Sequence, residues 1–81
     1  MKKHPAIAIV EFSDIPAGMS ATDAMLKKAP IAFVKCGTIS RGRYLVLIGG
    51  STASVEESVQ EGLFHGGSGV LDHLLLADVH P

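Results

Sequence analysis

The chain has 81 residues, a formal net charge of −1 and 47% hydrophobic residues, which fits one small domain over residues 1–81 and leaves no broad basic field for nucleic acid. A domain of this size buries only about 60% of its unfolded surface alone, so such an apolar chain needs further cover. One cysteine excludes an internal disulfide and indicates a reducing compartment, the cytoplasm, and no apolar run is long enough to predict a membrane span.

The first two elements predicted along the chain are a strand and a helix. Residues 6–12, AIAIVEF, are rich in β-branched side chains and predict a strand. Asp14 is a suitable N-cap for the helix that follows. Lys27 and Lys28 suit its last turn, and Pro30 ends it. Helical spacing predicts one core-facing stripe, made of Ile15, Met19, Thr22, Leu26 and Ala29.

A β-hairpin is predicted next, from strands at residues 31–39 and 43–49. The strands are joined by Ser40, Arg41 and Gly42, and Gly42 can adopt the positive φ that a tight turn needs. The lone Cys36 in the first of these strands is predicted to be a small buried hydrophobe.

A second helix and a last strand complete the pattern. The helix is predicted over residues 51–64 and ends at Gly66 and Gly67, and the strand covers residues 70–78. The order β-α-β-β-α-β predicts an α+β, ferredoxin-like fold, with one antiparallel sheet and both helices on one face. The core side of the second helix is predicted to carry Val55, Val59, Gly62 and Leu63.

The strand at residues 43–49 predicts a homo-oligomer because it is apolar on both faces. If both helices cover one face, Leu45 and Leu47 point from the other, where only another subunit or a missing element can cover them. These two leucines are therefore predicted to lie in a subunit interface.

Residues suited to catalysis or metal binding form no motif. The acidic side chains of the second helix resemble a solvated face, and no Ser/His/Asp or Cys/His arrangement is present, so we expect no enzyme. No metal site is expected either, because no i, i+4 spacing relates the four histidines, which are His4, His65, His73 and His80.

Four segments resemble the BMC domain of bacterial microcompartment shell proteins. They are AIAIVEFSDIPAGMSATDAMLKKAPI at residues 6–31, TISRGRYLVLIGG at 38–50, SVEESVQEG at 54–62 and LLLADVHP at 74–81. The details SDIPAGM and LADVHP are most similar to the tandem-domain, trimeric branch of the family. The resemblance implies that such a domain usually continues past Pro81, into a short helix or a second copy.

What the resemblance implies is a structural protein. Six such domains form a flat hexagonal tile, and tiles join with other shell proteins into a shell around enzymes. A pore on the symmetry axis passes metabolites. Ser40, Arg41 and Gly42 match the pore loop, where the charge of Arg41 would favour anionic metabolites.

The resemblance also assigns residues to the tile edge. Lys27 matches a lysine that packs against its counterpart on a neighbouring tile. Asp78 stands where the family has an edge arginine, and His80 where it often has histidine. Some tandem members hold an iron–sulfur cluster in a Cys-Pro-Gly loop, but this chain has Ser-Arg-Gly there, so no cofactor is expected.

Two alternatives share the predicted fold. A trimeric ferredoxin-like regulatory protein would bind small molecules between subunits, but such sensors need a long mobile loop where this chain has about three residues. An acylphosphatase-like hydrolase would need an arginine in the loop after the first strand, and residues 13–18 contain none.

Overall fold

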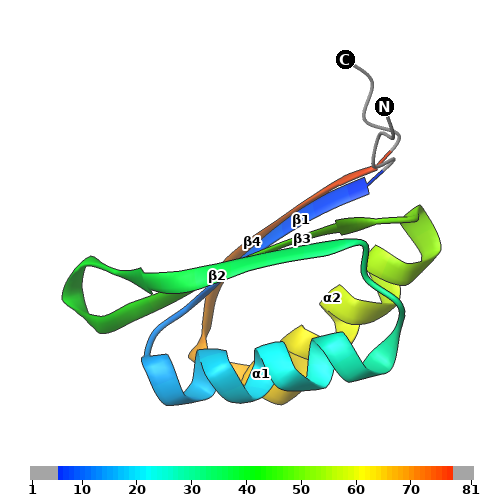
Figure 1. Ribbon diagram of the computed structural model, residues 1–81. Helices are drawn as coiled ribbons and strands as arrows, with labels where there is room; N and C mark the ends of the chain where they lie inside the picture. Colours follow the sequence, from blue (N-terminus) through cyan, green and yellow to red (C-terminus); the bar gives the residue numbers. More distant parts are fainter. Residues whose placement is uncertain (1–5, 78–81) are drawn as a thin grey trace.

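The protein is described by a computed structural model over residues 6–77. These residues contain four strands and two α-helices, whose arrangement Figure 1 shows. In chain order they are β1 (Ala6–Phe12), α1 (Ile15–Lys28), β2 (Phe33–Ile39), β3 (Arg43–Gly50), α2 (Thr52–Gly66) and β4 (Val70–Ala77). Single 3₁₀ turns, Ser40–Gly42 and Gly67–Gly69, follow β2 and α2.

The strands form one sheet in the order β2-β3-β1-β4, and every neighbouring pair is antiparallel. Both helices lie on the same side of this sheet (Figure 1). This is the predicted ferredoxin-like arrangement, with β1 and β3 in the centre and β2 and β4 at the edges. The sheet therefore has one face covered by helices and one face, called the open face below, that no described element covers.

The core lies between the helices and the two central strands. Along β1 the helix-facing residues are fully buried, and the alternate residues, Ile7, Ile9 and Glu11, lie on the open face. Val46 and Ile48 of β3 continue the buried layer, and Val55 and Val59 of α2 close it, as predicted. The two helices are also joined by a buried hydrogen bond of 3.0 Å, in which the Ser58 hydroxyl donates to the Met25 carbonyl oxygen.

Helix α1 begins as predicted but turns a different face to the core. The Asp14 carboxylate accepts a hydrogen bond of 2.8 Å from the Ala17 N–H. Met19 and Leu26, assigned to the core stripe, are 57% and 42% exposed, so that part of the prediction is wrong. The residues that α1 buries are Gly18, Ala21, Thr22 and Met25.

A close approach at Gly18 explains the rotation of α1. A Cβ atom at this position would overlap the side chain of Tyr44 on β3, so the helix presents its bare backbone to that ring. A helical pattern that counts only apolar side chains gives glycine no weight, and it therefore points to the wrong stripe.

The burial predicted for Cys36 is also wrong, because its side chain is exposed. Cys36 pairs with Val46 across β2 and β3 and so belongs to the helix-facing side of the sheet. The helices pack on the central strands. The edge strand β2 extends beyond the area that they cover, and all of its residues except Phe33 are exposed. The hydrogen bond with Cys36, and then burial, raise the pKa of Tyr44 above its usual value.

Candidate functional site

The tip of the β2–β3 hairpin carries an exposed arginine in an unusual backbone conformation. Arg41 has φ 68° and ψ 28°, and Gly42 follows with φ 74°. The sequence predicts positive φ at Gly42 but not at Arg41, because only glycine and a few polar residues favour the left-handed region. The hairpin reaches beyond the helices, as Figure 1 shows, and places Ser40, Arg41 and Gly42 together at one end of the molecule.

The charge at this tip is not neutralised within the described part of the chain. Arg43, at the base of the hairpin, forms an ion pair with Glu11 of β1 at 3.1 Å between Nη1 and Oε2. Arg41 has no ion pair with any residue from 6 to 77. The Glu11 carboxylate is thus engaged by Arg43, and the Arg41 guanidinium remains available to a ligand or a neighbouring copy.

Lys27 lies in the last turn of α1, as predicted. Its side chain is 76% exposed and forms an i, i+4 ion pair of 2.9 Å with Asp23. An exposed pair of this kind contributes little to stability and leaves the ammonium group accessible. Asp78 and His80, the other two residues assigned to the tile edge, lie outside the described residues.

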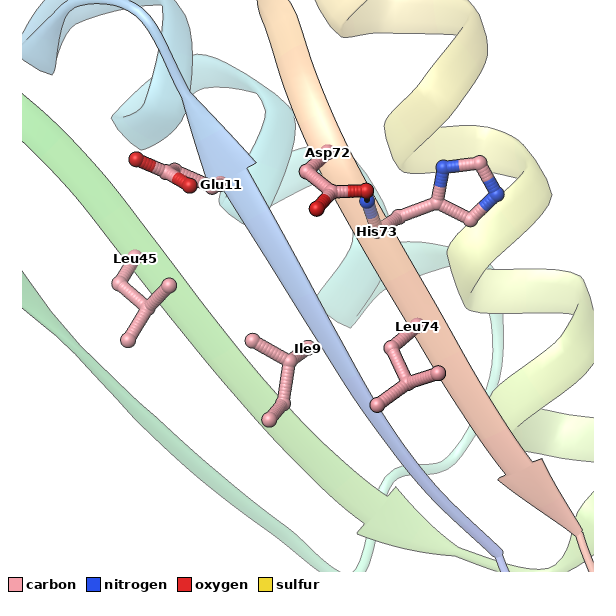
Figure 2. A pocket seen from close by; sticks show the side chains of 6 residues that line it. All are labelled: Ile9, Glu11, Leu45, Asp72, His73 and Leu74. Carbon is pink, nitrogen blue, oxygen red and sulfur yellow. Dashed lines mark hydrogen bonds between the residues drawn. The ribbon is translucent and has the colours of Figure 1, made fainter.

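The open face of the sheet is apolar at its centre. Leu45 and Leu47 of β3 alternate with the buried residues of the same strand and point to this face. Figure 2 shows Ile9 of β1 between Leu45 of β3 and Leu74 of β4, on three neighbouring strands. These side chains line a shallow depression of about 150 Å³, together with Glu11, Asp72 and His73.

Acidic groups stand at one end of this depression. Glu11 and Asp72 are cross-strand neighbours, and Figure 2 shows both carboxylates on the hairpin side of the apolar floor. No local pattern in the sequence marks these two residues as neighbours, because such a pattern does not specify which strand pairs with β4. Strand order supplies the missing information, because it sets Asp72 opposite Glu11 and Glu11 opposite Leu45.

No metal centre or membrane segment is evident among the residues that the structure describes. Residues 6–77 contain no group of three or more His, Cys, Asp or Glu side chains placed to hold a metal ion. None of the described helices is both long enough and apolar enough to cross a membrane. The chemically distinctive features are thus the hairpin tip, the open face and the two edge strands.

The chain is similar in sequence to shell proteins and in fold to a microcompartment protein. The BMC domain family matches residues 6–79. The bacterial microcompartment shell protein PduT of Citrobacter freundii is 36% identical over 75 residues, which cover 93% of this chain and 41% of that protein. The carboxysome shell protein CcmK2 of Synechococcus elongatus is 34% identical over 79 residues, covering 93% of this chain and 78% of CcmK2.

A solved structure agrees with these relatives. A microcompartment protein from Desulfitobacterium hafniense DCB superposes with a TM-score of 0.88 at 39% sequence identity, over 94% of this chain and 42% of that one. The chain thus spans less than half the length of PduT and of this solved protein. Because the family match includes all of the described residues and the fold agrees, the chain belongs to the BMC domain family.

Proposed function

We propose that the protein is a structural, non-catalytic subunit of a bacterial microcompartment shell, which assembles with copies of itself and with other shell proteins. The observation that carries this proposal is the open face of a BMC domain, where Leu45 and Leu47 have no cover from any described element. Apolar surface of this kind marks a protein interface. The relatives PduT and CcmK2 are themselves shell proteins.

The assembly that fits best is a disc of six such domains, with the hairpin tips gathered around its axis. Ser40, Arg41 and Gly42 then form the rim of a pore, and Lys27 lies on the perimeter, where discs meet edge to edge. The exposed hairpin tip and the exposed Lys27 ammonium support these positions. The three-residue tip does not favour a sensor with a long mobile loop between β2 and β3.

A ring of arginines would make the proposed pore selective for anionic metabolites. Two guanidinium groups about 8 Å apart in water repel each other by about 0.5 kcal/mol, which is small enough for a ring to tolerate. The positive φ of Arg41 fixes the direction in which the chain leaves the strand, so the guanidinium groups project from a short, defined turn. A bound sulfate or phosphate would relieve the repulsion.

Native mass spectrometry and electron microscopy test the assembly, and titration with inorganic sulfate tests the pore. We expect wild-type discs to bind sulfate on their axis, Arg41→Ala discs to bind it at least tenfold more weakly, and Arg41→Glu discs not to bind it. Lys28→Ala is the matched control, because Lys28 carries the same charge but lies at the end of α1 beside Glu61. Equal sulfate affinity in the wild type and Arg41→Ala would contradict the pore assignment, and a monomeric wild type would contradict the shell role.

A further inference from the structure

Both edges of the sheet expose apolar side chains. On β4, Leu74 and Leu76 are 54% and 48% exposed, and on β2, Val34 and Ile39 are 40% and 39% exposed. Edge strands are places where other chains bind, and natural proteins usually protect them with charge or with a covering element. The described residues supply no such cover at either edge. Both edges therefore have the character of contact surfaces.

The two edges carry opposite charges on the same face. Lys35 of β2 pairs with Leu47 of β3, and Asp72 of β4 pairs with Glu11 of β1, which places both charged residues on the open face. Asp72 pairs with Glu11, Glu11 with Leu45, and Leu45 with Gly37. Gly37 lies two residues along β2 from Lys35. The two charges thus stand at nearly the same level, one at each edge.

Neither charge has an ion-pair partner within the described part of the chain. Lys35 and Asp72 form no ion pair with any of residues 6–77. Within the same residues, the Asp72 carboxylate accepts one hydrogen bond, from the backbone N–H of the adjacent His73. They cannot reach each other, because three strand spacings of about 4.8 Å separate the two edges by about 14 Å. Glu11, the neighbouring carboxylate, is already engaged by Arg43.

We propose that the two edges are the two halves of one heterologous contact, in which the β2 edge of one copy docks on the β4 edge of the next and Lys35 pairs with Asp72. The apolar floor of Ile9, Leu45 and Leu74 in front of Asp72 suits the aliphatic stem of a lysine, whose ammonium then reaches the carboxylate. Pairing like edges would oppose like charges, so the contact is head-to-tail, and it closes into the proposed ring when the rotation between copies is about 60°.

This contact deepens the proposed disc and rests on it. Lys35 stands six residues from Arg41, or about 20 Å along the strand from the hairpin tip. In a sixfold ring the spacing between neighbouring copies equals their distance from the axis, so copies at that level lie about 20 Å apart or slightly more. After subtraction of the sheet width, a gap of roughly 6–10 Å remains between β4 and the next β2, which side chains fill.

Charge reversal on the 81-residue chain tests the pairing, with assembly measured by native mass spectrometry and by sedimentation over a range of protein concentrations. We expect Lys35→Glu and Asp72→Lys each to raise the concentration needed for half-assembly by about tenfold or more, through like-charge opposition. The double variant, Lys35→Glu with Asp72→Lys, should assemble like the wild type. Glu56→Lys is the matched control, since it makes the same reversal on the exposed side of α2 and should leave assembly unchanged.

A mixture of the two single variants gives a second, independent result. Every contact between unlike variants is attractive, and every contact between like variants is repulsive, so alternating rings with an even number of copies should form. Native mass spectrometry should then show the mass of a six-membered ring that contains three copies of each variant.

Two results would overturn the pairing while leaving the shell role intact. The first is that both single variants assemble like the wild type. That result would mean that another part of the protein, such as the chain beyond residue 77, covers β4. The other is a double variant and a mixture that both fail to assemble although the circular dichroism shows folded protein. If the wild type itself forms no ring at any concentration, the proposed shell function fails together with this contact.

Discussion

Replacement of Gly18 by alanine should destabilise the protein, although the same change inside an ordinary helix stabilises it. Glycine in a helix interior costs about 1 kcal/mol relative to alanine, so helix propensity alone predicts a gain. The structure predicts the opposite, because a Cβ atom on Gly18 would lie 2.6 Å from Cγ of Tyr44. Ordinary carbon contacts are about 3.5–4.0 Å, so α1 and β3 would have to separate locally by about 1 Å.

The magnitude follows from the two opposing contributions. Overpacking of this kind costs about 1–3 kcal/mol, and the gain in helix propensity offsets up to about 1 kcal/mol of it. We therefore expect the free energy of unfolding to fall by about 1–2 kcal/mol. For a domain of this length, that corresponds to a Tm lower by roughly 5–15 °C.

Urea denaturation at one fixed protein concentration provides the measurement, since assembly makes stability depend on concentration. Gly37→Ala is the matched control, because a Cβ atom on Gly37 would meet no other atom within 4 Å, and the residue lies on the exposed edge strand. Its free energy of unfolding should change by no more than about 0.5 kcal/mol. A Gly18→Ala variant as stable as the wild type, or more stable, would refute the account of α1 packing.

Three further outcomes are expected. Leu47→Asp should leave the domain folded but abolish discs, because it places a charge in the uncovered apolar surface; a folded variant of unchanged assembly mass would exclude the open face from the interface. Lys27→Asp should preserve discs and stop their growth into sheets by electron microscopy, and unaltered sheets would remove Lys27 from the perimeter. Stability should also fall as the pH rises above about 10, the ordinary pKa of tyrosine. The reason is that the folded state raises the pKa of Tyr44 and so favours its neutral form, a contribution present at lower pH and lost on ionisation. Tyr44→Phe should lack this part of the pH dependence in urea titrations, and an identical pH dependence in both proteins would count against it.

The fold was predictable because its local signals agree with one another. The Asp14 cap, the hairpin at Ser40–Gly42 and the glycine stop after α2 are each encoded within a few residues, and the structure has all three. The alternation of β3 also predicted correctly that Leu45 and Leu47 lie on the face opposite the buried Val46. Chain order and period therefore sufficed for the architecture.

Features that depend on contacts between distant segments were less predictable. The face that α1 buries depends on the approach of Tyr44 to Gly18, and the exposure of Cys36 depends on how far the helices extend over β2. The juxtaposition of Asp72 with Glu11 requires the register of β4 against β1, which no local pattern specifies. The pore and edge positions came from family resemblance, and they stay predictions until an assembly is measured.

The left-handed backbone of Arg41 restricts which side chains could replace it. Glycine, asparagine and aspartate adopt φ near 68° at little cost, and unbranched residues tolerate it, whereas valine, isoleucine and threonine would be strained by their branched Cβ. The tip of the hairpin can thus change its charge from positive to neutral or negative through a single substitution, but it cannot readily become a branched aliphatic plug. In the proposed pore, substitutions at this position that change permeability would therefore be restricted to small and polar residues, and a hydrophobic gate would have to be built from a neighbouring residue.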